Sequence, residues 1–224
     1  MLWHGRSNYD NGLERYYTKK PKKWRAPSWS WASIEGPIAF YRPYNVETLE
    51  GGTNSPRCRV EIISAECSPS SLDPTGTVAT GSLVIKGSGH LTRLKHAEDC
   101  TGHGTQHYTV VPTGLKSFSR HSNFTVDGEE AEVDYDLIEQ GLMEENSDMS
   151  IYRLYIGGRS HAQRVFRLSE GDYISASFFR TWCLLLHCVN GNIFKRVGFL
   201  VHDHYNGDET SIWNNLEDCM ITII

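Results

Sequence analysis

The strongest constraint on the fold is a pair of apolar segments joined by a tight-turn signal. Trp182 to Leu186 is short and continuously apolar, which is typical of a β-strand covered on both faces. Asn190-Gly191-Asn192 follows, and an Asn-Gly pair supplies the positive φ angles that a hairpin loop needs. The pattern predicts a hairpin of two strands, Phe178 to Val189 and Ile193 to Val201.

Much of the remaining chain alternates with the two-residue period of a strand, and no segment shows a sustained helical period of 3.6 residues. Gly87-Ser88-Gly89 is expected to form a tight link between two strands, and residues 137–145 to form a turn or two. Further strands are predicted at residues 38–41, 57–67, 77–86, 90–94, 107–111, 130–137, 151–156 and 219–224.

These strands predict an all-β or mainly β fold, arranged as an antiparallel sandwich or irregular barrel with few short helices. At 224 residues the chain is long enough to bury a core without disulfide or metal staples. We interpret residues 1–23 as an N-terminal extension and residues 24–224 as a single β-rich domain.

Charge is distributed unevenly along the chain. Residues 1–60 contain ten Lys or Arg and five Asp or Glu, whereas residues 127–148 contain ten acids and no Lys or Arg. In residues 130–137 the acids, Asp134 among them, alternate with apolar residues, which predicts that they line the wet face of a half-buried strand. The basic stretch Lys19 to Arg25 carries no nucleic-acid-binding motif, so a solvated loop is the favoured interpretation. The acidic and basic segments could contact each other or separate partners.

Cysteine usage and hydropathy indicate a cytoplasmic setting. The six cysteines include no C-x-x-C pair, which favours reduced thiols. The first residues contain no apolar run typical of a secretory signal, and the longest apolar stretch is less than half of the ~20 residues that a membrane helix requires. We expect a soluble cytoplasmic protein without a cofactor, with a protein partner of unidentified kind and no membrane or nucleic-acid ligand.

The most specific candidate for a chemical site is a cluster of four residues of the kinds that bind metal ions: His96, Cys100, His103 and His107. Their separations would suit a zinc ion, but the paired Cys-x-x-Cys knuckle of a zinc finger is missing. A solvated loop is the favoured interpretation and a zinc site the alternative. His202-Asp203-His204 is interpreted as a surface turn. No Gly-x-Ser-x-Gly nucleophile elbow occurs in the sequence, and no catalytic residue is assigned.

Trp29 and Trp31 stand two residues apart, which places them on one face of an extended strand over residues 24–33. Paired indoles of this kind usually fill a core, and we expect both to be buried. The alternative is that exposed indoles line a groove for a carbohydrate or peptide, because flat aromatic faces stack on such ligands.

Three separated stretches carry distinctive combinations of residues. Arg25 to Ile38 reads RAPSWSWASIEGPI; Pro74 to Gly87 joins Pro-Thr-Gly to Gly-Ser-Leu-Val-Ile-Lys-Gly; Lys195 to Phe199 and Ile221 to Ile224 read KRVGF and ITII. In this order they resemble the region that follows the HET domain in large fungal heterokaryon-incompatibility proteins. We take as signature or core positions Trp24, Pro27, Trp29, Trp31, Gly36, Pro37, Gly76, Gly81, Arg196 and Gly198.

The resemblance implies a setting in fungal non-self recognition, in which such proteins trigger growth arrest or cell death when unlike hyphae fuse. No stretch of the sequence matches the HET domain, to which the family's activity is attributed, and we expect the chain to be a fragment. The resemblance implies a non-catalytic accessory or interaction domain. A small-ligand or carbohydrate-binding β module that uses exposed aromatics is the alternative.

Overall fold

The computed structural model describes residues 2–5, 8–10, 13–16, 19–36, 38–41, 57–72, 78–96, 124–127, 129–134, 137–145, 147–167, 173–205 and 216–224. In this part of the chain the only helix is the short 3-10 helix η1 (Trp31–Ser33), and no helix is long and apolar enough to cross a membrane. The predicted all-β class is confirmed. The strands are β1 (Leu2–Gly5), β2 (Asn8–Asp10), β3 (Leu13–Tyr16), β4 (Ile38–Tyr41), β5 (Arg57–Cys58), β6 (Val60–Pro69), β7 (Val78–His96), β8 (Phe124–Val126), β9 (Glu129–Glu130), β10 (Glu132–Val133), β11 (Asp148–Arg167), β12 (Tyr173–Asn190), β13 (Ile193–Tyr205) and β14 (Asp218–Ile223).

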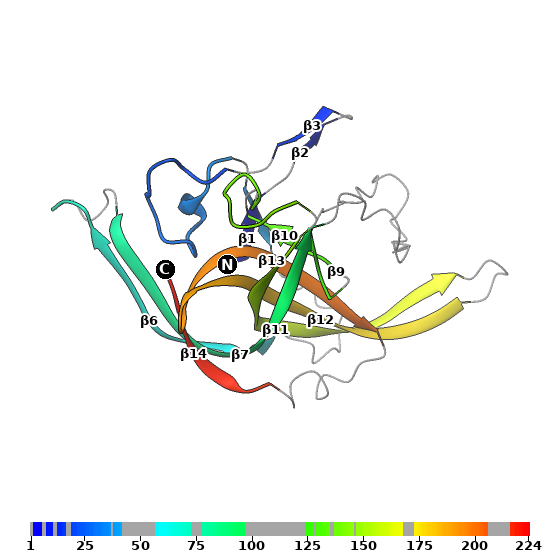
Figure 1. Ribbon diagram of the computed structural model, residues 1–224. Helices are drawn as coiled ribbons and strands as arrows, with labels where there is room; N and C mark the ends of the chain where they lie inside the picture. Colours follow the sequence, from blue (N-terminus) through cyan, green and yellow to red (C-terminus); the bar gives the residue numbers. More distant parts are fainter. Residues whose placement is uncertain are drawn as a thin grey trace.

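The main sheet closes on itself and forms a small irregular barrel (Figure 1). Its strands follow the order β11, β12, β13, β14 and β7, and β7 pairs in turn with β11. Neighbours are antiparallel except for β13 and β14, which run parallel through two residue pairs. Closure of this kind removes the exposed edges that an open sheet would leave.

The long strand β7 changes its partner near the middle. Residues 83–88 pair with β14, whereas residues 89–95 pair with β11. Gly89 stands at this change, where an added Cβ would lie 2.4 Å from the carbonyl oxygen of Arg153. The predicted tight link at Gly87-Ser88-Gly89 is therefore wrong, because β7 continues through all three residues without a turn. Gly89 instead allows β11 to approach β7 closely.

The β12–β13 hairpin is confirmed, and Gly191 in its loop has φ 54°. Burial on both faces of β12 is also confirmed, because the five side chains from Trp182 to Leu186 are each at most 8% exposed. Trp182, Leu184 and Leu186 face the barrel interior, while Cys183 and Leu185 face the opposite side of the sheet.

Two hydrophobic cores result from this alternation. The interior core draws on all five barrel strands, and the outer core lies between the outer face of the sheet and the described residues 124–127, 129–134 and 137–143. The interior core comprises Ile85, Leu154, Trp182, Leu184, Leu186, Phe194, Phe199, Ile221 and Ile223. The outer core includes Ile34, Leu94, Phe124, Val126, Ala131, Val133, Leu137, Ile151, Tyr155, Cys183, Leu185, Val197 and Leu200. Each fully buried aliphatic side chain contributes roughly 1.5–3 kcal/mol to folding before entropy is counted.

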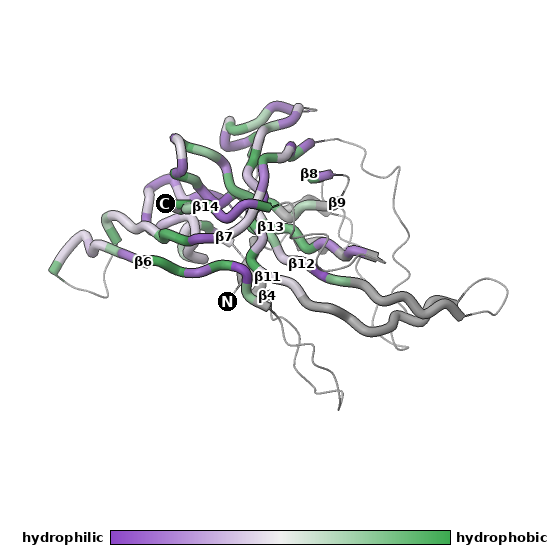
Figure 2. Tube along the Cα trace, turned by 90° about the horizontal axis from the view of Figure 1, so that it is seen from below, coloured by the Kyte–Doolittle hydropathy of each residue, from purple (hydrophilic) through white to green (hydrophobic). Residues whose placement is uncertain are grey.

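Strand β6 extends from the barrel as one arm of a hairpin with β7 (Figure 1). Hydrophobic and polar residues are interleaved along it (Figure 2), and Ile62 and Ile63 are 65% and 49% exposed. The strand predicted at residues 57–67 is confirmed as β5 and β6. The N-terminal strand β1 pairs with β4 in a separate two-stranded sheet.

The segment expected to form a tryptophan strand instead consists of turns and η1. Ser30 caps η1 by accepting a hydrogen bond from the backbone N–H of Ala32 at 3.3 Å. Trp29 is half-buried and packs against the interior core, but Trp31 is 56% exposed. The prediction that both indoles fill a core is therefore wrong for Trp31, because the helical turn after Ser30 breaks the two-residue alternation.

Candidate functional site

Residues from the three distinctive stretches of the sequence meet around Ser28. Its backbone N–H donates to the carbonyl of Ile224 at 3.1 Å, and its hydroxyl donates to the same oxygen. The hydroxyl oxygen also accepts from the backbone N–H of Arg196 at 3.0 Å. Pro27 packs against Gly81, where an added Cβ would lie 2.3 Å from its Cγ. This cluster, the Ser28 junction, joins segments nearly 200 residues apart.

Arg196 extends the junction into the outer core. Its Nε donates to Oδ2 of Asp134 at 2.8 Å and its Nη2 to Oδ1 at 3.1 Å, while the two residues are 3% and 1% exposed. Val133 pairs with the buried Gly198, which places Asp134 beside Arg196. The prediction that Asp134 lies on a wet face is wrong, because this bidentate partner compensates its buried charge.

We call residues 24–36 the signature segment. Hydrogen bonds fix its backbone, while two of its three indoles are exposed to solvent. Arg25 Nε donates to the carbonyl of Ala32 at 2.6 Å, its Nη2 donates to the carbonyl of Ile34, and its Nη1 lies 3.7 Å from a carboxylate oxygen of Glu35. Trp24 and Trp31 are nevertheless 51% and 56% exposed. The loop therefore presents two large apolar side chains from a fixed backbone. Gly36 ends it with φ 122°.

The basic and acidic segments do contact each other at one point. Lys19 Nζ lies 4.0 Å from Oε1 of Glu139, with both side chains more than half exposed. Lys19 also forms a two-way backbone bridge with Glu35. Exposed ion pairs of this kind contribute little to stability.

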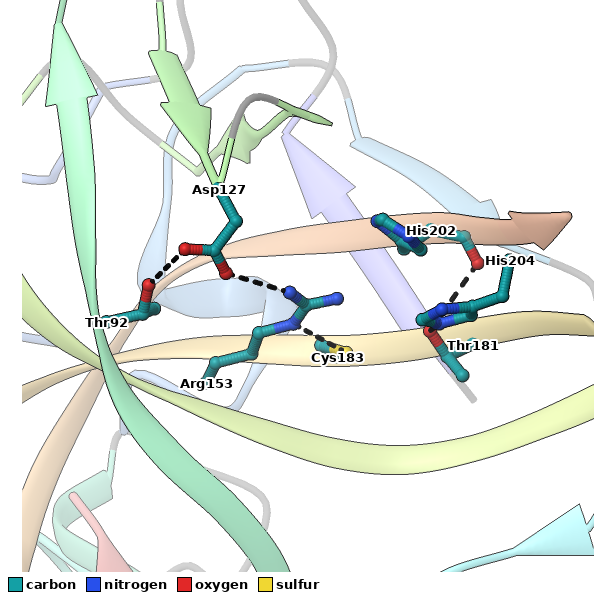
Figure 3. Close-up of polar contacts among 7 residues, drawn as sticks. All are labelled: Thr92, Asp127, Arg153, Thr181, Cys183, His202 and His204. Atoms are coloured by element: carbon teal, nitrogen blue, oxygen red, sulfur yellow. Dashed lines mark hydrogen bonds and ion pairs between the residues drawn. The ribbon is translucent and has the colours of Figure 1, made fainter. Parts of the chain in front are cut away.

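A second polar cluster lies on the outer face of the sheet (Figure 3). Arg153 of β11 is 4% exposed; its Nη1 donates to Oδ2 of Asp127 at 3.1 Å and its Nε to Sγ of Cys183 at 3.5 Å. Thr92 donates to the other carboxylate oxygen of Asp127 at 2.8 Å. The guanidinium carbon lies 5.0 Å from the ring centroid of Tyr155, a cation–π distance. We call these residues the Arg153 cluster.

Burial sets the protonation states around Arg153. It raises the pKa of Tyr155 to about 12 and raises the pKa of the Cys183 thiol, so both groups stay neutral near pH 7. Burial also lowers the pKa of His90, whose ring centroid lies 5.8 Å from that of Tyr155, and the Arg153 charge adds to this effect. The cluster thus holds one cation, one carboxylate and neutral donors.

His202 and His204 continue the polar face on β13. Because residues two apart on a strand share a face, their rings come together, with centroids 4.1 Å apart. Thr181 Oγ1 lies 3.0 Å from Nε2 of His204. The interpretation of these histidines as a surface turn is wrong: β13 continues through both residues, and both are half-buried.

The candidate zinc cluster falls mostly outside the described residues. His96 is described and its ring centroid lies 5.1 Å from that of Phe124, but Cys100, His103 and His107 lie beyond those residues. Within the described part of the chain, no group of three or more His, Cys, Asp or Glu is placed to hold a metal ion. The signature positions Pro37 and Gly76 also lie outside the described residues.

Sequence reasoning did not identify the Arg153 cluster. One signal was available: Arg153 interrupts the otherwise apolar run of residues 151–156, and a basic residue on a buried strand requires a partner. That partner, Asp127, is the first residue of the acidic stretch 127–148. In comparisons with known proteins, no protein-family model, no curated protein and no solved structure matches this chain.

Proposed function

We propose that the chain is a non-catalytic accessory domain of a fungal heterokaryon-incompatibility protein, and that it docks onto the HET domain through its signature segment. The proposal begins from the resemblance of Arg25 to Ile38, Pro74 to Gly87 and the two C-terminal stretches to the region that follows the HET domain.

The Ser28 junction supports this proposal, and it is the observation that carries it. Residues that define the signature in sequence are in mutual contact: Pro27 packs on Gly81, and Ser28 bonds to Arg196 and Ile224. Residues that contact one another in this way are expected to occur together in the sequence of a domain that is inherited as a unit.

The exposure of the signature indoles favours docking over a purely internal role. Trp24 and Trp31 are both more than half exposed, although Arg25 fixes the loop between them. Trp is among the residues that contribute most to protein interfaces, and a fixed loop loses little entropy on binding.

The test is a calorimetric titration of the chain with a separately purified HET domain from an incompatibility protein that carries the same signature. Trp31→Ala should weaken binding at least tenfold and leave the melting temperature unchanged. Leu91→Ala is the matched control, because Leu91 is 72% exposed on β7, and it should bind as the unmodified chain does. No binding by the unmodified chain would refute the proposal.

The same two exposed indoles favour the alternative, a carbohydrate-binding β module. Sugar rings stack on exposed Trp faces, so the two functions share their predicted contact residues. The titration separates them when a soluble β-glucan replaces the HET domain as the titrant. Saturable glucan binding that is lost in Trp31→Ala, without HET-domain binding, would establish the alternative.

A further inference from the structure

Strand β6 forms an exposed edge of the main sheet. Among the described residues it pairs with β7 alone, so no described strand covers the backbone N–H and C=O groups on its other side. Figure 1 shows β6 on the outer side of the β6–β7 arm. Ile62 and Ile63 near its middle are both exposed, and β6 contains no lysine. Edges of this kind are templates for pairing with a further strand.

A β-bulge in β6 restricts which strand can pair with this edge. Ile62 lies opposite Ile85 of β7 and Ser64 lies opposite Val84, so Ile63 is an extra residue on β6. A regular strand has no matching extra residue, and its hydrogen bonds would fall out of step at the bulge. A second copy of β6 carries the same bulge, so the two irregularities can face each other.

The bulge also allows a pairing of two β6 strands about a two-fold axis. Glu61 lies opposite Lys86 and Ser64 opposite Val84, while Lys86 and Val84 are two residues apart on β7. Glu61 and Ser64 therefore project on the same face of the sheet, although they are three residues apart. When two antiparallel copies meet about an axis at the bulge, Glu61 of one copy lies opposite Ser64 of the other, and opposed residues must share a face.

The side chains of two copies complement each other in this register. Ile62 of one copy lies opposite Ile63 of the other, and Arg59 lies opposite Glu66, both of which are exposed. By symmetry each of these contacts occurs twice. A slip of two residues would instead place Glu61 opposite Glu66, and like charges directly opposite each other are destabilising.

We propose that β6 is a dimerisation edge, on which two copies of the chain pair antiparallel about a two-fold axis at the bulge, with Arg59 of each copy against Glu66 of the other. The pairing spans residues 59–66, a small interface, so we expect a transient dimer. It uses a different segment from Trp24 and Trp31 and does not depend on the docking function proposed above.

Sedimentation velocity of the full chain at increasing concentration tests the dimer. The unmodified chain should show a reversible equilibrium between monomer and dimer. Ile62→Lys should remove the dimer, because it places a charge beside the axis in both copies. Leu91→Lys is the matched control, because Leu91 is also exposed and lies on β7 outside the part that pairs with β6. It should dimerise as the unmodified chain does, and thermal melts check that both variants fold.

A charge exchange tests the register. Arg59→Glu and Glu66→Arg each place like charges opposite each other at both contacts, so either variant alone should dimerise at least tenfold more weakly. Mixed in equal amounts, the two variants should form a heterodimer with about the affinity of the unmodified dimer, because each acid then faces an arginine. Glu145→Arg reverses an exposed charge outside β6 and should have no effect.

A chain that stays monomeric up to millimolar concentration would overturn the proposal, and so would a dimer that persists unchanged in Ile62→Lys. Failure of the two charge variants to associate when mixed would overturn it as well. A monomer whose β6 amides become protected from hydrogen exchange only on addition of the HET domain would assign this edge to that partner instead. Absence of HET-domain binding would leave the dimer results unaffected, because sedimentation uses the chain alone.

Discussion

Replacing Asp134 by Asn should destabilise the protein far more than replacing any exposed acid. The two residues of the Arg196–Asp134 pair are 3% and 1% exposed, and they share two hydrogen bonds of 2.8 and 3.1 Å. An asparagine would place an amide N–H against one of the guanidinium donors. It would also leave the buried Arg196 charge without its counter-ion.

The expected loss can be worked out from these contacts. Removing one partner of a buried, hydrogen-bonded ion pair costs about 3–5 kcal/mol. For a chain of this size each 1 kcal/mol lowers the melting temperature by at least about 2 °C, so the melting temperature of Asp134→Asn should be lower by at least ~6–10 °C. The exposed pair of Lys19 and Glu139 provides the control, since Glu139→Gln should change stability by at most about 0.5 kcal/mol.

A double variant separates charge burial from loss of packing. Asp134→Leu combined with Arg196→Met removes both charges and retains apolar volume, and such replacements are often neutral or stabilising. The double variant should therefore be more stable than Asp134→Asn alone. Urea unfolding followed by circular dichroism measures all three free energies of unfolding.

If the free energy of unfolding of Asp134→Asn lay within 1 kcal/mol of that of the unmodified chain, the buried pair would not have the stabilising role described above. A double variant that is no more stable than Asp134→Asn would also contradict it, because it would mean that the two charges do not compensate each other.

Three further predictions concern packing and titration. Trp29→Ala should lower the melting temperature by several degrees, because Trp29 packs on the interior core, whereas the exposed Trp31 can be replaced without loss; a thermal melt of each variant checks this. Gly89→Ala should destabilise the barrel by about 1–3 kcal/mol or more in urea unfolding, because its Cβ would meet the Arg153 carbonyl oxygen at 2.4 Å. Burial raises the pKa of Tyr155 to about 12, so the folded state retains a proton that the unfolded chain loses near pH 10. Stability should then fall between about pH 10 and 12, with a smaller fall in Tyr155→Phe, measured by urea unfolding at successive pH values.

The parts of the fold that were predictable from sequence are those that local pattern determines. A strand of consecutive apolar residues removes all its side chains from water only when both of its faces are covered. The run from Trp182 to Leu186 is buried in this way. The loop after Asn190 was predictable because glycine adopts positive φ at low cost, and Gly191 does so.

Two of the wrong predictions share one physical cause, which is contact with a distant segment. Gly89 permits the approach of β11, and Asp134 is buried by Arg196 at a separation of 62 residues. Neither partner can be deduced from a two-residue or 3.6-residue period. In the signature segment, the Ser30 cap and the Arg25 bonds to backbone carbonyls replace an expected strand by a helical turn.

The Arg153 cluster was missed because its residues come from four separate segments. His90 and Thr92 lie on β7, Arg153 on β11, Cys183 on β12, and Asp127 in the turn after β8. Their juxtaposition depends on barrel closure through β7 and β11, which no local sequence signal specifies.

Hydrogen exchange of the chain with and without a purified HET domain is the most direct test of the proposed role as a docking domain. The proposal predicts slower exchange in residues 24–34, which carry Trp24 and Trp31, and unchanged exchange in β12. Unchanged exchange in residues 24–34 at saturating HET domain, or protection confined to other segments, would contradict it.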